Sequence, residues 1–265
     1  MKYEILNHLK EYLNAEYTEN TAKRYYSAVN SLFQGLQFDS LDQIRKEDIE
    51  GRIQSLKTKN EVSAAKNGLK NLYEMDPTLQ IPDQEYFQEV SSKKRNIRKN
   101  KGEKIYLDTV KRKVNQISND KLRLAYRLAM ISGARVSELA DLEKQNIVFE
   151  DEKITVNIID GKGGKDRVIK CMPDPYVYQR LQEYLNDYDL EDNIFYSESY
   201  MREKAWELGL EMHDFRRIFA ILEKKRLRKE GVTAYEANKI VMEQLGHDRF
   251  ETTKRYLYGK KLIVR

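Results

Sequence analysis

The chain has very few of the residues that bind metals or form disulfides. Among its 265 residues there are one cysteine, Cys171, and three histidines. A single cysteine excludes an intrachain disulfide and a cysteine-based metal site. The sequence also contains no His-Glu-x-x-His pattern, which would suggest a helical zinc site. We therefore expect neither a bound metal nor another cofactor.

Long apolar runs are missing as well. None approaches the roughly 18–20 residues that a membrane-spanning helix needs, and the first residues, Met1-Lys-Tyr-Glu-Ile, are unlike a signal peptide. Hydrophobic residues still make up 40% of the chain, enough for one large core or two modest ones. We expect a soluble, cytoplasmic protein without a membrane partner.

Positive charge is concentrated in one short segment. Residues 91–104 carry seven Lys or Arg and one acidic residue, whereas residues 1–90 have a net charge of −4 and residues 105–265 of +3. Such a basic run is often a solvated linker, and it can equally contact a polyanion by releasing condensed counterions. Fully extended, it would span on the order of 45 Å.

Residues 1–90 read as a helical domain. Apolar residues recur at helical spacing in residues 3–13, 21–33, 41–56 and 62–73, with a plausible helix cap at Thr18 or Asn20. Prolines at 77 and 82 then interrupt the pattern. We therefore predict a domain over 1–90, a basic linker over 91–104 and a second domain over 105–265.

The second domain contains both helix-like and strand-like patterns of apolar residues. Residues 107–130 predict two helices, the second of which ends at Ser132-Gly133, and 136–142 a short helical turn. Three β-rich runs follow at 146–149, 153–159 and 167–171, the last two joined as a hairpin by residues 160–166. Helices return from Asp174 onward. The predicted fold class is mainly α with a small antiparallel β-sheet, in two domains.

Several cationic motifs follow one another along this second domain. Arg135 lies in Ser-Gly-Ala-Arg-Val-Ser-Glu, three residues before Glu138. The two could form an exposed ion pair of little consequence, or Glu138 could orient a guanidinium that grips two phosphate oxygens. The turn Gly161-Lys-Gly-Gly-Lys-Asp-Arg167 lacks the spacing of a P-loop. It could be a plain flexible hairpin, or a mobile tip that delivers Lys162, or less favourably Lys165, into a groove.

The C-terminal part holds the most specific pattern. His213 and Arg216 lie one helical turn apart and share a face. Leu245-Gly-His247 follows, with Tyr256 nine residues after the histidine and Tyr258 eleven residues after it. A metal-dependent nuclease is disfavoured, because the key residues are cationic where a metal would need carboxylates.

In this order and spacing, these motifs resemble the tyrosine recombinase (phage integrase) family, and the resemblance covers most of the chain. It implies a site-specific recombinase or integrase that cleaves DNA through a 3′-phosphotyrosyl intermediate and a Holliday junction, without metal or ATP. Tyr256 would attack, Arg135, Arg216 and His247 would stabilise the phosphate, Lys162 would protonate the 5′-oxygen and His213 would assist proton transfer or contact the phosphate. Glu138 would support Arg135.

The resemblance also implies partners and an architecture. A helical core-binding domain and an α+β catalytic domain would form a C-shaped clamp on double-stranded DNA and assemble as a tetramer, with accessory DNA-bending or directionality factors as further possible partners. The candidate DNA-binding residues are basic side chains of the first domain and of the linker: Lys23, Arg24, Lys66, Lys93, Lys94, Arg95, Arg98 and Lys99.

The chain also departs from the family. Arg217 stands where a histidine usually follows the second arginine, and its role is open. Only nine residues follow Tyr256, and the Leu-Ile-Val run at 262–264 predicts either a short strand, pairing in cis or in trans, or a frayed end. The chain starts directly with the helical domain, which favours a Xer-like or small mobile-element layout without an arm-binding domain. Two alternatives remain: a type IB topoisomerase or telomere resolvase, and a non-catalytic DNA-binding regulator.

Overall fold

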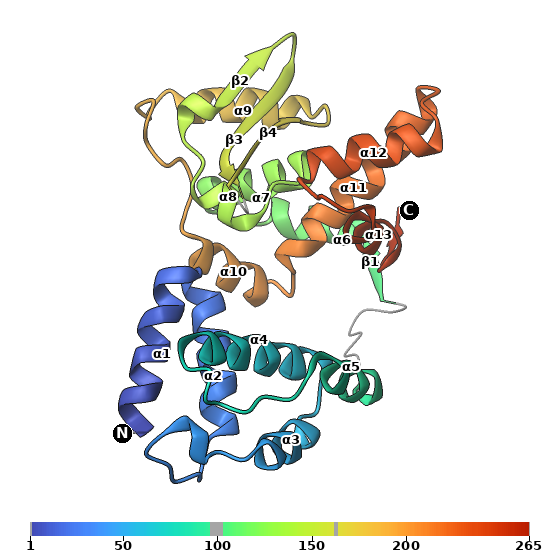
Figure 1. Cartoon of the computed structure of the whole chain (residues 1–265). Coiled ribbons are helices and arrows are strands. Elements are labelled where there is room, and N and C mark those ends of the chain that lie inside the picture. Colours follow the sequence, from blue (N-terminus) through green and yellow to red (C-terminus); the bar gives the residue numbers. More distant parts are fainter. Residues whose placement is uncertain (1, 96–102, 162–163, 265) are drawn as a thin grey trace. The chain divides into compact units, whose positions relative to one another are not determined.

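A computed structural model describes residues 2–95, 103–161 and 164–264. The chain forms two compact units, Met1–Lys99 and Asn100–Arg265, and each is described by itself (Figure 1). Most of the described residues are helical, and the strands are short. This agrees with the predicted fold class of mainly α structure with a small antiparallel sheet.

The first unit is built of helices packed around an apolar core. Its elements are α1 (Lys2–Glu16), α2 (Glu19–Leu32), the 3₁₀ helix η1 (Leu41–Gln43), α3 (Lys46–Ser55), α4 (Lys59–Met75) and α5 (Gln84–Lys93). Helix α4 begins at a capping box, in which the Thr58 hydroxyl accepts from the backbone N–H of Glu61 and the Glu61 carboxylate accepts from that of Thr58. Helices α2 and α4 meet closely at Gly68, where a Cβ would lie 2.7 Å from Val29 Cγ2.

Two of the sequence predictions for this unit need correction. The helix predicted over 41–56 is a 3₁₀ turn followed by the shorter α3, because the chain is extended at Ile44 and Arg45. Helix α5 was not predicted. It begins at Asp83, whose carboxylate accepts from the backbone N–H of Tyr86 at 2.8 Å, and it extends to Lys93. The first residues of the predicted linker therefore belong to a helix of the first unit.

The second unit combines helices packed around α7 with a three-stranded and a two-stranded sheet. Its elements in order are β1 (Lys104–Tyr106), α6 (Leu107–Asn115), α7 (Asp120–Ser132), α8 (Val136–Ala140), η2 (Lys144–Asn146), β2 (Ile147–Glu150), β3 (Lys153–Gly161), β4 (Lys165–Lys170), α9 (Pro175–Leu185), α10 (Glu198–Glu207), α11 (Met212–Lys229), α12 (Ala234–Gln244), α13 (Phe250–Tyr258) and β5 (Lys261–Ile263). Helix α7 is almost wholly buried. It packs against α11, with the rings of Tyr126 and Phe215 5.1 Å apart.

Strands β2, β3 and β4 form the predicted antiparallel sheet in that order. Val156 of β3 is fully buried and pairs with Ile147 on one side and Ile169 on the other. The β3–β4 register shifts between Ile158 and Gly161, at the base of the predicted hairpin turn. Because Ile158 pairs with Arg167, the hairpin places this arginine near the rest of the unit.

The C-terminal residues form a strand, one of the two alternatives that the sequence left open, and it pairs in cis. β5 lies parallel to β1, with Leu262 opposite Ile105. The pair joins the start of the second unit to the residues that follow α13.

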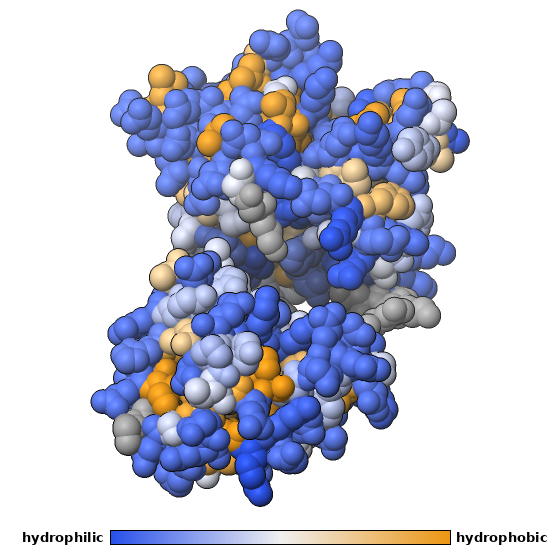
Figure 2. All heavy atoms as spheres, viewed as in Figure 1, coloured by the Kyte–Doolittle hydropathy of each residue, from blue (hydrophilic) through white to orange (hydrophobic). Residues whose placement is uncertain are grey.

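The face of the molecule seen in Figure 2 is mainly hydrophilic, and its hydrophobic residues form separate patches. Within the described residues, no helix combines the length and apolar character needed to cross a membrane.

Candidate active site

Arg135 follows directly from the end of α7. Gly133 ends the helix with a positive φ of 65°, and the next residues lead into α8. The backbone N–H of Arg135 donates to Glu138 Oε2 at 2.6 Å, and its Nη1 donates to Oε1 at 2.5 Å. The Glu138 side chain is only 4% exposed. An exposed ion pair, one of the two interpretations of the sequence, is therefore wrong: the pair is part of a buried network.

Arg167 of β4 is the main partner of Glu138, and the sequence reasoning missed it. Its Nη1 and Nη2 donate to the two carboxylate oxygens at 2.8 and 2.6 Å, and its Nε donates to the backbone carbonyl of Gln244 at 3.0 Å. Arg167 ends the glycine turn that was singled out for its lysines. The available signal was its place opposite an inward-facing residue of the preceding strand, Ile158.

Glu138 remains ionised although it is buried. Burial alone favours the neutral acid, but the hydrogen bonds and charge of Arg167, followed by those of Arg135, hold the pKa of Glu138 at about 2. The carboxylate thus offsets part of the positive charge that the arginines bring together, and it fixes the direction of two guanidinium groups.

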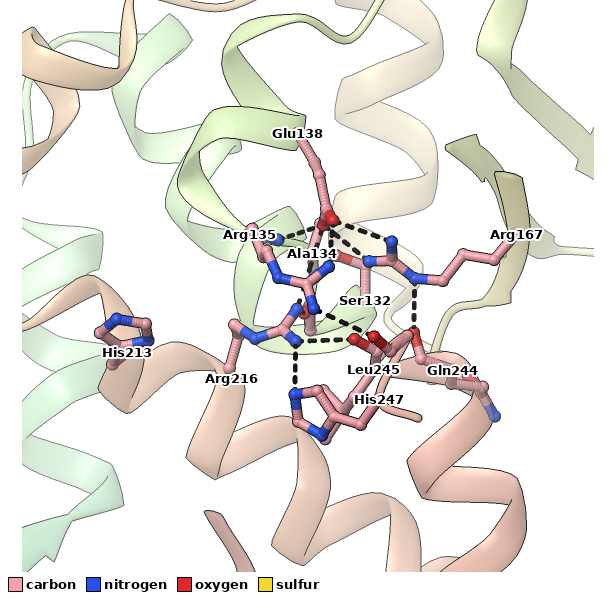
Figure 3. A network of polar contacts seen from close by, with 12 residues as sticks. Ser132, Ala134, Arg135, Glu138, Arg167, His213, Arg216, Gln244, Leu245 and His247 are labelled. Atoms are coloured by element: carbon pink, nitrogen blue, oxygen red, sulfur yellow. Dashed lines mark hydrogen bonds and ion pairs between the residues drawn. The ribbon is translucent and has the colours of Figure 1, made fainter. Parts of the chain in front are cut away.

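Arg216 of α11 is the third arginine of this network (Figure 3). It is 2% exposed, and it donates to the backbone carbonyls of Gly133 and, at 2.8 Å, of Leu245. Its Nη1 lies 4.0 Å from Glu138. Burial lowers the pKa of Arg216 to about 10, so the group stays cationic at neutral pH. Its buried Nε has no protein hydrogen-bond partner among the described residues.

His247 follows Gly246, which has a φ of 64° and whose carbonyl accepts from Arg135 Nη2 at 3.1 Å. Nε2 of His247 lies 3.4 Å from Arg216 Nη2, and Nδ1 lies 3.0 Å from Thr253 Oγ1. Because a guanidinium only donates, we assign Nε2 as the acceptor and Nδ1–H as the donor to the threonine. Burial, followed by the charges of the neighbouring arginines, lowers the pKa of His247 to about 4.

The Tyr256 hydroxyl lies 3.2 Å from Nδ1 of His213. The Tyr256 ring is 5.3 Å from the His247 ring, and its centroid is 5.5 Å from Cζ of Arg216. Burial, followed by the charges of Arg216 and Arg217, lowers the pKa of His213 below its usual 6.5. The imidazole is therefore neutral at pH 7 and can accept a proton.

These side chains border one pocket of about 330 Å³. It is lined by Arg135, Val136, Ser137, Arg202, Met212, His213, Arg216, His247, Thr252 and Tyr256. Five of the six predicted catalytic residues thus meet at one cavity. Tyr258, the weaker candidate nucleophile, is 61% exposed, and its hydroxyl accepts from Lys224 at 2.8 Å instead.

The sixth predicted catalytic residue, Lys162, lies outside the described residues. The alternative lysine, Lys165, forms an ion pair with Asp248, the residue directly after His247. This pair connects the hairpin to the turn that carries His247. The ammonium of Lys165 is thus already paired with a carboxylate.

The predicted DNA-binding residues that the structure describes differ in exposure and in contacts. Lys23 is exposed, and Arg24 donates to the backbone carbonyl of Asn60 at 3.0 Å. Lys93 pairs with Glu89 at 2.5 Å, and Lys94 donates to the carbonyl of Gln54. The remaining described members are the half-buried Lys66 and the exposed Arg95. Arg98 and Lys99 lie outside the described residues, and the role of the whole set stays a prediction.

The donor chemistry does not suit a metal ion. Within the described part of the chain, no three His, Cys, Asp or Glu side chains come together as metal ligands. The pocket is instead bordered by guanidinium and imidazole groups, which suit an anion such as a phosphate.

Comparison with known sequences shows the family of the chain. The sequence model of the phage integrase family matches residues 95–261. The chain belongs to the phage integrase family. It is also 30% identical over 168 residues to a protein of Pyrococcus furiosus described as tyrosine recombinase XerA, a match that covers 56% of this chain and 54% of that protein. The chain thus matches about half the length of this curated relative.

Solved structures share the fold. A crystal structure of a lambda integrase (75–356) dimer bound to a COC′ core site is similar with a TM-score of 0.67 and 18% identity, over 96% of this chain and 94% of that one. A lambda integrase tetramer bound to a Holliday junction is similar with a TM-score of 0.64 and 16% identity, over 93% of this chain and 77% of that one. At these identities the likeness concerns the fold.

Proposed function

We propose that this member of the phage integrase family is a site-specific DNA recombinase that uses Tyr256 as its nucleophile. The observation that carries the proposal is the Tyr256 hydroxyl, 3.2 Å from an imidazole nitrogen of His213, on a pocket also lined by Arg135, Arg216 and His247. A phosphate in this pocket would meet cations and hydrogen-bond donors, as phosphoryl transfer requires.

In the proposed reaction, the Tyr256 oxygen attacks the scissile phosphorus and its proton passes to Nδ1 of His213. The bond from phosphorus to the 5′-oxygen breaks, Lys162 protonates that oxygen, and a 3′-phosphotyrosyl bond and a free 5′-hydroxyl remain. Arg135 and Arg216 stabilise the negative charge that develops on the non-bridging oxygens. His247, held by Thr253, would donate through Nε2 once that nitrogen carries a proton, which a bound phosphate favours.

The covalent intermediate conserves the phosphodiester energy, so that the 5′-hydroxyl of a partner strand can reverse the step without ATP. Two such exchanges would recombine two duplexes through a Holliday junction. We propose double-stranded DNA as the partner, a tetramer on DNA as the assembly, and a clamp formed by the two units. The structural relatives bound to a core site and to a Holliday junction support this architecture.

A nicked suicide substrate tests the proposal. Duplexes carrying candidate sites from the DNA that flanks the gene are incubated with the protein in EDTA, and denaturing gels are examined for a covalent protein–DNA band. The band should form with the wild type and with Tyr258→Phe, and it should be lost in Tyr256→Phe. A wild type that binds this DNA but forms no band would refute the enzyme and favour a DNA-binding regulator. A band lost only in Tyr258→Phe would refute Tyr256 as the nucleophile.

A further inference from the structure

Asp214, between the active-site residues His213 and Arg216, holds two cations at once. It accepts a hydrogen bond from Arg217 one turn later on α11, and the ammonium of Lys260 lies 3.2 Å from its carboxylate. The Asp214 side chain is 15% exposed and that of Arg217 14%. Both residues lie beside the pocket and outside the catalytic set of the proposed function.

Lys260 is the more unusual of the two cations. Its side chain is 4% exposed, and its ammonium lies 3.1 Å from Glu103 and 3.2 Å from Glu211 as well as contacting Asp214. A lysine is rarely buried unless it is paired. The three carboxylates come from the segment before β1, from the residue that precedes α11 and from the first turn of α11. Lys260 thus ties the residues after α13 to the segment before β1 and to the start of α11.

Each cation also has a direct relation to Tyr256. The guanidinium carbon of Arg217 lies 5.8 Å from the centroid of the Tyr256 ring. Lys260 follows Tyr256 by four residues, immediately after the end of α13 at Gly259. The backbone packs closely at Gly259, because a Cβ there would lie 2.3 Å from the carbonyl oxygen of Arg255. One cation therefore contacts the ring of the tyrosine, and the other fixes the chain just beyond its helix.

We infer that Asp214, through Arg217 and Lys260, positions the Tyr256 hydroxyl against His213. The contact between Arg217 and the Tyr256 ring restricts the rotation of the ring. The ion pairs of Lys260, just after α13, restrict the movement of that helix. Asp214 is the residue that follows His213 in the chain. The contacts of Asp214 therefore fix Tyr256 relative to the imidazole that accepts its proton. The inference deepens the proposed function and rests on it.

The alternative is that these ion pairs only stabilise the fold. Helix α11 offers a matched comparison, because Arg226 pairs at 2.7 Å with Glu223, three residues before it, as Arg217 pairs with Asp214. Glu223 is 1% exposed. Arg226→Met thus removes a pair of this kind, together with the pair between Arg226 and Glu230, from the same helix and away from the pocket lining.

The experiment compares Arg217→Met and Lys260→Met with Arg226→Met in the full chain. Covalent-complex formation is measured on saturating DNA, alongside the DNA dissociation constant and the melting temperature. Arg217→Met and Lys260→Met should slow cleavage about 10- to 100-fold, the effect of a misplaced reacting group, with DNA binding nearly unchanged. Arg226→Met should cleave at close to the wild-type rate at a similar melting temperature. Equal cleavage rates in all three variants would overturn the inference.

A substrate with a 5′-bridging sulfur separates positioning from leaving-group chemistry, because a thiolate leaves without a proton. The Arg217→Met rate should remain low on this substrate. A recovered rate would mean that Arg217 acts on the leaving group, and it would overturn the inference.

A second readout needs no cleavage. With 3-fluorotyrosine at residue 256, the free protein should give one narrow ¹⁹F resonance, which should broaden or divide in Arg217→Met and Lys260→Met but not in Arg226→Met. An unchanged resonance in both would contradict the inference. If the wild type forms no covalent complex, the proposed function fails, and the ¹⁹F comparison still decides whether these cations hold Tyr256. A variant that does not fold is replaced by Arg217→Lys or Lys260→Arg, which should retain the narrow resonance.

Discussion

Arg167 and Glu138 form a two-point hydrogen-bonded pair, at 2.8 and 2.6 Å, in the middle of the arginine network. Their side chains are 10% and 4% exposed. The same carboxylate binds Arg135 and lies 4.0 Å from Arg216. One anion therefore hydrogen-bonds two guanidinium groups and lies near a third, and it offsets only part of their positive charge.

The first prediction concerns this pair. Arg167→Lys keeps the charge but loses the planar fork, so one oxygen of Glu138 loses its partner. We expect the free energy of unfolding to fall by about 1–3 kcal/mol and cleavage by about 10-fold, because Arg135 is held less firmly. Urea unfolding and covalent-complex formation measure the two effects.

Arg45→Lys is the matched control for this change. Arg45 also donates two hydrogen bonds to one carboxylate, that of Asp48, both at 3.0 Å, but its side chain is 75% exposed. Because exposed pairs contribute little, we expect almost no change in the free energy of unfolding there. Equal losses at the two sites would mean that burial of the network adds nothing.

The second prediction is a pH dependence of stability. The folded-state pKa of His247 is about 4, below the ordinary 6.5. Between these values the unfolded chain binds the proton and the folded chain does not, so stability is full above pH 6.5 and falls as the pH drops towards 4. The loss from His247 should be about 2 kcal/mol, allowing for the solvent that reaches the ring.

Denaturant unfolding at several pH values checks this. The slope between pH 6.5 and 4 should be shallower in His247→Gln than in the wild type. His213 has its pKa lowered in the same direction, so some slope should remain in the variant. Parallel curves for the two proteins would show that His247 is not held neutral by its surroundings.

Much of the second unit could be predicted from the sequence because its local patterns agree with its tertiary structure. Three of its element boundaries are marked by local signals. Gly133 ends α7, the apolar residues begin to alternate as in a strand at residue 147, and Asp174 caps α9. Arg167 was missed because its importance comes from Glu138, 29 residues away in sequence. Helix α5 was missed because it lies between prolines at 77 and 82 and a run of basic residues, a setting that resembles a linker. Its Phe87 and Val90 are nevertheless buried in the core of the first unit. The partners of Lys260 lie in two segments distant from it in sequence, which no local pattern shows.

The third prediction concerns the thiol. Cys171 follows β4 and is buried, and burial raises the pKa of its thiol above the ordinary value. We expect it to react with maleimide only as fast as the protein opens. Labelling should therefore be slow in buffer and rapid in denaturant. Fast labelling of the native protein would mean that the sheet opens locally at this residue.

The last prediction concerns the end of α7, which borders the pocket lined by Arg216. Gly133 has a φ of 65°, and a Cβ there would lie 2.4 Å from Cδ1 of the fully buried Phe219. Its carbonyl also accepts from Arg216. Gly133→Ala should therefore lower the free energy of unfolding by about 2–4 kcal/mol, from backbone strain and overpacking together, and it should weaken cleavage by displacing Arg216.

Gly231→Ala separates the two causes. Gly231 has a φ of 87° and nothing within 4 Å of its Cβ position, so it carries the backbone strain alone. We expect a loss of about 1 kcal/mol there and unchanged cleavage. Thermal unfolding of the two variants measures the difference, which isolates the contact with Phe219. If Gly133→Ala were no more harmful than Gly231→Ala, the close packing of α7 on α11 would not be what holds Arg216 in the pocket.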